Sequence, residues 1–105
     1  EMTPTYPKWT PSYIEGISQT TMKMFNKRPE IEWYEIGVFD EEWEPIPFVT
    51  KNKILRLKYL GHVTFDVYIG ANNLDKAEYI CSLSKIKGDN MNKPMMSSKI
   101  CSRFK

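Results

Sequence analysis

The sequence predicts an α+β domain in which one N-terminal helix packs on an antiparallel sheet of four or five strands. A helix-start signal, Ser12-x-x-Glu15, directly follows Pro11, and after Pro29 the apolar residues alternate with a period of two. With 105 residues, 41% of them hydrophobic and 13% aromatic, the chain is long enough for one compact domain over 1–105 and too apolar to stay disordered.

The N-terminal quarter divides into an arm and a helix. Residues 1–11 contain three prolines and no regular period, which predicts an extended arm. After the capping box, Arg28-Pro29 ends the run, because the residue before a proline is disfavoured in the helical conformation. We therefore expect a helix over 12–27, whose apolar residues share one face: Ile14, Ile17, Met24 and Phe25.

The segment after Pro29 reads as strands. Residues 31–39 alternate with both faces largely apolar, which is typical of a central strand. The run 43–49 contains Pro45 and Pro47, which have no N–H to donate and therefore confine it to an edge or a bulge.

The next residues predict a hairpin and a last strand. Segments 54–60 and 63–69 flank Gly61-His62, with an inward row of Val63, Phe65, Val67 and Ile69. A strand over 77–84 places Tyr79, Cys81 and Leu83 on one face, and 85–105 is expected to form a basic C-terminal tail.

Cys81 and Cys101 are 20 positions apart. In a small secreted domain they predict a disulfide that ties the tail to the sheet, and in a cytosolic protein they are two reduced thiols. The chain begins at Glu1 without a charged and then apolar leader, so we expect any signal peptide to have been removed. Secretion is the first expectation for localisation, and the cytoplasm is the alternative.

The charges are segregated although their sum is only +2. Residues 30–44 hold acids and no Lys or Arg, whereas 51–58 hold bases and no acids. This pattern suits a polarised partner surface or a phosphate-contacting face. The alternative is that acidic and basic strands neutralise each other across the sheet.

Two sets of residues are candidate contact sites. Exposed aromatic groups beside an acidic rim predict a protein-binding set of Trp9, Trp43, Glu41, Glu42 and Glu44. Aromatic and basic groups on the predicted hairpin predict a nucleic-acid contact of Arg56, Lys58, Tyr59 and His62.

The sequence contains no nucleotide-binding, serine-hydrolase or Cys-x-x-Cys motif, and its single His62 provides no catalytic partner set. One histidine and two distant cysteines do not form a zinc site, and the acidic run 40–44 lacks the calcium-loop glycine. We expect no catalytic residues, no metal, no cofactor and no membrane span, and hence a protein that is not an enzyme.

The order of arm, capped helix, aromatic strand and the run Trp43-Glu44-Pro45-Ile46-Pro47-Phe48 resembles the secreted ribonuclease-like effectors of fungal plant pathogens, such as powdery mildews. The resemblance covers 6 to about 84. It implies a ribonuclease-like fold without activity, because the family's active relatives use a His, a Glu and an Arg together. It departs from the family at Tyr6-Pro7-Lys8, which lacks the usual cysteine.

Three functions follow from these observations. The first is a non-enzymatic secreted interaction protein, resembling an effector that binds a host protein or RNA, as a monomer or weak oligomer. The second is an RNA-binding or weakly ribonucleolytic domain. The third is a small intracellular phage or bacterial inhibitor of a host enzyme.

Overall fold

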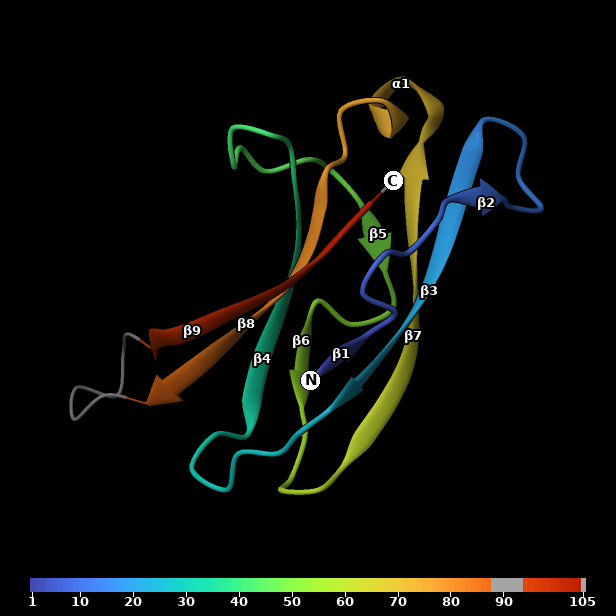
Figure 1. Ribbon diagram of the computed structural model, residues 1–105. Helices are drawn as coiled ribbons and strands as arrows, with labels where there is room; N and C mark the ends of the chain where they lie inside the picture. The colour runs from blue at the N-terminus through green and yellow to red at the C-terminus, as the bar shows by residue number, and fades with distance from the viewer. Residues whose placement is uncertain (88–93, 105) are drawn as a thin grey trace.

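The computed structural model describes residues 1–87 and 94–104. These residues form two antiparallel sheets packed face to face (Figure 1). Sheet A contains β1 (Met2–Thr3), β2 (Thr10–Pro11), β3 (Ile17–Phe25), β5 (Val49–Thr50) and β7 (His62–Gly70). Sheet B contains β4 (Trp33–Phe39), β6 (Ile54–Arg56), β8 (Tyr79–Lys87) and β9 (Pro94–Arg103), and the short helix α1 (Ala71–Leu74) joins the two layers.

The strand order is β1-β3-β7-β5 in sheet A, with β2 also pairing β3, and β6-β4-β8-β9 in sheet B. The core lies between the sheets. Sheet A contributes Met22, Met24, Val67 and Ile69, and sheet B contributes Tyr34, Ile36, Val38, Ile80 and Phe104. The α+β prediction is therefore wrong, because the fold is almost entirely β.

The expected helix over 12–27 is a turn followed by β3. The Ser12 hydroxyl accepts the N–H of Ile14 at 3.1 Å in a local turn, and Gly16 adopts a φ of +81° that no helix contains. From Ile17 onward every second side chain faces the core, and Met22 is fully buried. The period is therefore two, and the helical steps among the apolar residues were coincidental.

The central strand is confirmed: β4 pairs with both β6 and β8. The proline-containing run forms an isolated bridge from Pro45 to Phe39 and then the two-residue edge strand β5. The expected hairpin over 54–69 is wrong. At the tight turn where Gly61 donates its N–H to Lys58 O at 2.8 Å, the chain leaves β6 in sheet B and enters β7 in sheet A (Figure 1).

Residues 1–11, expected as an arm, contain β1 and β2, and residues 85–104 contain the end of β8 and β9. Residues 88–93 and 105 of the expected tail lie outside the described part of the chain. The β8–β9 pair extends away from the rest of the sandwich (Figure 1). The last segment is therefore an edge of sheet B and is continuous with it.

Candidate partner-binding edge

The outer edge of β9 is open at Lys99 and Cys101, whereas the N-terminal segment covers it at Arg103. The N–H of Phe104 bonds to Glu78 O on the β8 side at 2.8 Å, whereas the N–H of Arg103 bonds to Thr5 O on the opposite side at 3.1 Å. Because backbone groups alternate in direction along a strand, Lys99 and Cys101 also direct their N–H and C=O groups away from β8. No described backbone group bonds to them there.

The core-facing side of β9 is partly uncovered at this edge. Ser102 and Phe104 are buried between the sheets, but Ile100, on the same face of the strand, is 40% exposed. Phe104 stacks on Trp9 with ring centroids 4.5 Å apart. An added strand beside β9 would therefore find both unpaired backbone groups and an apolar side chain.

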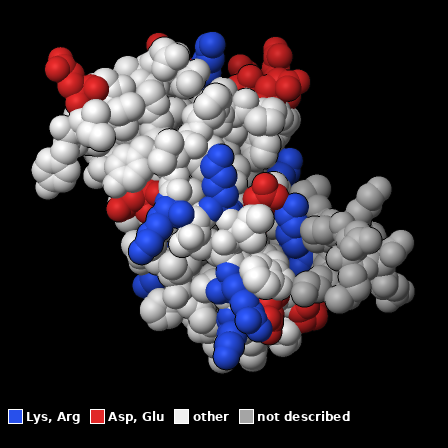
Figure 2. Space-filling model, turned by 180° about the vertical axis from the view of Figure 1, so that it is seen from behind, with Lys and Arg blue, Asp and Glu red and all other residues white. Residues whose placement is uncertain are grey.

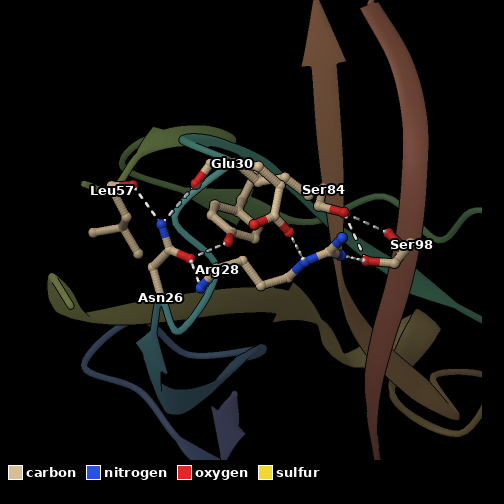
Figure 3. Close-up of polar contacts among 8 residues, drawn as sticks. Asn26, Arg28, Glu30, Leu57, Ser84 and Ser98 are labelled. Carbon is tan, nitrogen blue, oxygen red and sulfur yellow. Dashed lines mark hydrogen bonds and ion pairs between the residues drawn. The ribbon is translucent and has the colours of Figure 1, made fainter. Parts of the chain in front are cut away.

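Several side-chain contacts hold β9 in place. A disulfide joins Cys101 to Cys81 on β8, which confirms the predicted pairing. Nearer the start of the strand, the Arg28 guanidinium donates to the Ser98 hydroxyl at 2.9 Å and to the Glu30 carboxylate at 2.8 Å. Ser98 also bonds Ser84 on β8 (Figure 3). The disulfide and Ser84 thus attach the edge to sheet B, and Arg28 attaches it to the connection between β3 and β4.

Asn26 is the buried centre of that connection (Figure 3). Its side-chain amide donates to Ile31 O at 2.7 Å and to Leu57 O at 2.8 Å. Its oxygen accepts the Arg28 N–H at 2.9 Å and the Tyr34 hydroxyl at 2.5 Å. Every polar atom of this side chain is satisfied, and the segments it joins are those where the chain changes sheets.

Tyr34 is expected to make the stability of the fold depend on pH in the alkaline range. Burial raises the pKa of the Tyr34 phenol above its usual value of 10.0. The phenol therefore ionises more readily in the unfolded chain, so its contribution is complete below about pH 10 and is lost as the pH rises towards the higher folded pKa. We expect thermal denaturation to show a steeper fall in Tm above pH 10 for the native chain than for Tyr34→Phe. Parallel curves for the two proteins would contradict this assignment.

Only part of the predicted protein-binding set is brought together, because Trp43 lies among the acidic residues and Trp9 does not. Trp9 is half-buried against Phe104 within the sandwich, and its Nε1 has no hydrogen-bond partner among the described residues. Trp43 is 43% exposed and stacks on Tyr79 at 4.1 Å, on the outer face of sheet B, with Lys99 Nζ 3.9 Å from its ring centroid. The acidic side chains of the predicted set, all exposed, lie on the adjoining turn: Glu41, Glu42 and Glu44.

The predicted nucleic-acid residues are divided between the two sheets. Arg56 ends β6 and pairs with Glu32 at 3.1 Å, whereas His62 begins β7. Lys58 and Tyr59 are exposed on the turn between them.

Acidic and basic segments meet in ion pairs: Arg56 with Glu32, Lys85 with Glu35, and Arg28 with Glu30. In Figure 2, basic side chains lie along the middle of the visible face, with acidic ones among them and at its upper corners. Mutual neutralisation thus accounts for Arg56 of the basic segment 51–58, whereas its lysines form no ion pair with a described residue.

Within residues 1–87 and 94–104, no three His, Cys, Asp or Glu side chains gather as a metal site. The described helix is too short to cross a membrane.

No protein-family model and no curated protein matches this chain. Among solved structures, the E. coli chaperone DraB superimposes with a TM-score of 0.66 and 16% identity over 99% of this chain. The periplasmic chaperone SfaE superimposes with a TM-score of 0.51 and 15% identity over 99% of this chain. The chain spans about half of each chaperone, 52% in both cases.

The chain has an immunoglobulin-like fold. Its strand order matches that architecture: β1-β3-β7-β5 follows the A-B-E-D order in one layer, where β2 also pairs β3. In the other layer β4-β8-β9 follows the C-F-G order, and β6 is added beside β4. The resemblance to ribonuclease-like effectors is therefore wrong, because that scaffold packs a helix on one sheet. The functions drawn from it or from composition are corrected too, since the similar structures are chaperones and not effectors, RNA-binding proteins or enzyme inhibitors.

Sequence reasoning missed the β9 edge, although one signal for it was present. A disulfide needs its two Cα atoms within about 7 Å, so a bond from Cys101 to the predicted strand brings the tail close to that strand. Cys101 pairs in register with Cys81, with a Cα–Cα distance of 4.0 Å. A disulfide between neighbouring antiparallel strands therefore marks the tail as a further strand.

Proposed function

We propose that this immunoglobulin-like domain is a non-enzymatic chaperone module that holds a partner polypeptide by strand addition along β9. The open edge of β9 carries the proposal, because Lys99 and Cys101 direct unpaired backbone groups outward beside the exposed Ile100. The names of the similar structures, a chaperone and a periplasmic chaperone, support it.

We also infer that the module works outside the cytoplasm, in the periplasm or another exported location. The disulfide supports this, because such bonds persist in oxidising compartments. The partner is a protein with an unpaired sheet edge or a missing strand, since strand addition supplies backbone hydrogen bonds and side-chain pockets together.

A refolding assay tests the proposal. The probe is an unfolded immunoglobulin-like domain whose last strand has been deleted, diluted from denaturant while light scattering is recorded. We expect the native chain to suppress aggregation and Lys99→Pro to lose most of that effect, since proline removes an outward N–H without disturbing the β8 ladder.

Lys99→Ala, which keeps the N–H but removes the side chain, separates the backbone from the charge. Lys23→Glu, on the outer face of β3, is the remote control. Ile100→Asp is expected to be as defective as Lys99→Pro. Equal suppression by the native chain and Lys99→Pro would overturn the proposal.

A further inference from the structure

A second sheet edge, on β7, also has backbone groups without a neighbouring strand. The side chains around it differ from those around β9. β5 pairs only with Val67 and Tyr68, so the rest of β7 down to His62 has no strand beside it in the described residues. This edge lies in sheet A, in the layer opposite to β9.

The direction of the backbone groups on β7 follows from three contacts. Gly61 O accepts the N–H of Asn26 at 2.9 Å, and the N–H of Ala71 bonds to Gly16 O at 2.8 Å, both at the ends of β3. Asp66 O accepts the Thr50 hydroxyl at 2.7 Å, on the β5 side. By alternation, His62 and Thr64 direct their N–H and C=O groups to the open side.

A hollow of about 410 Å³ lies against this edge. Val63 and Phe65, whose side chains share the core-facing row with the buried Val67, line it together with Leu55 of sheet B. They are only half-buried. A strand placed beside β7 would set the side chain opposite Val63 into this hollow, because directly opposed residues share a face.

The charges around the edge are mainly basic. Lys51 lines the hollow, and Lys58 lies on the turn that leads into His62. Neither lysine forms an ion pair with a described residue, nor does Lys53, whose Nζ lies 5.0 Å from the Phe48 ring centroid. Asp66, which also lines the hollow, accepts a hydrogen bond from Thr21. Lys51 and Lys58, against the one carboxylate of Asp66, leave this edge positive.

We propose that the β7 edge between His62 and Thr64 binds an extended acidic peptide segment of a partner. The peptide adds antiparallel to β7 in continuation of β5, places apolar side chains at alternate positions in the hollow, and pairs terminal carboxylates with the free lysines. This explains why the basic segment 51–58 retains lysines that no acidic strand neutralises. The site is separate from the β9 edge.

The test uses a dye-labelled peptide, Glu-Glu-Thr-Val-Thr-Val-Glu-Glu, with blocked ends, followed by fluorescence anisotropy and by amide hydrogen exchange of the full chain. We expect saturable binding that weakens with salt, together with slower exchange at the amides of His62 and Thr64. Thr64→Pro is expected to weaken binding at least tenfold, whereas Thr64→Ala stays within about twofold, because only proline removes the outward N–H.

The charge part of the test is the double variant Lys51→Glu/Lys58→Glu, which is expected to weaken binding roughly tenfold. Lys76→Glu, at an exposed position beyond α1 at the other end of β7, is the control. A peptide of the same sequence with N-methylated backbone amides is expected not to bind. Equal binding of that peptide, or of a polyglutamate of equal charge, would overturn strand addition. Protection of Lys99 and Cys101 instead of Thr64 would also overturn the proposal and would place the peptide on β9.

Discussion

Asn26→Ala is expected to lower the free energy of unfolding by about 3–5 kcal/mol. The substitution removes the donors to Ile31 O and Leu57 O and the acceptor for the Tyr34 hydroxyl, all in the buried connection between the sheets. Buried polar groups without partners each cost about 1–3 kcal/mol, and alanine supplies no replacement.

Urea denaturation followed by tryptophan fluorescence measures this effect. Asn52→Ala, at an exposed position of the β5–β6 connection, is the matched control and is expected to change stability by less than about 0.5 kcal/mol. A loss below about 1 kcal/mol for Asn26→Ala would show that the freed carbonyl groups find other partners.

Replacement of both cysteines, Cys81→Ala/Cys101→Ala, is the second large effect. The disulfide closes a loop with a sequence separation of 20, for which chain entropy gives a stabilisation of about 3 kcal/mol. We expect that loss in urea denaturation, with faster amide hydrogen exchange at Ser102 on β9 than at Ile36 on β4, because β9 is held to the sheet along one side only.

The mass of the native protein after alkylation provides an independent check of the same bond. We expect the native chain to take up no alkylating reagent until a reductant is added, and two equivalents afterwards. Uptake of reagent by the untreated native protein would contradict both the bond and the exported location inferred from it.

The parts of the fold that followed from sequence are those where local pattern and tertiary context agree. The alternation over 31–39 identified the central strand that the structure has as β4, and the two prolines near β5 marked an edge. Cys81 and Cys101 were paired correctly.

The errors share one cause: local signals were ambiguous where tertiary contacts decide. Ser12 and Glu15 have the spacing of a capping box, but the hydroxyl bonds within a turn, and Gly16 directs the chain into a strand. The decisive residue was Met22, which lies off any helical stripe and is fully buried in the sandwich. Gly61-His62 has the composition of a hairpin turn. In the structure Gly61 O accepts the N–H of Asn26, and the chain passes here from sheet B to sheet A.

The candidate sites were less accessible to sequence reasoning. An open sheet edge consists of unpaired backbone groups. Because every residue has backbone groups, no residue type in the sequence indicates such an edge. Of the aromatic residues chosen from sequence, Trp43 lies with the acidic groups on the outer side of sheet B, whereas Trp9 packs inward against Phe104. Only the unpaired lysines of 51–58 could be expected from the sequence, because that segment contains no acidic residue.

The buried methionines of sheet A allow local opening of the sandwich to be measured in the native protein. Met2, Met22 and Met24 are all buried, at 6%, 0% and 1% exposure. Peroxide converts a methionine thioether to a sulfoxide only where it gains access, so oxidation at these positions requires the sandwich to open. Rates of oxidation at the three positions, read by mass spectrometry, therefore rank how often β1 and β3 separate from the rest of the fold, without any label or substitution.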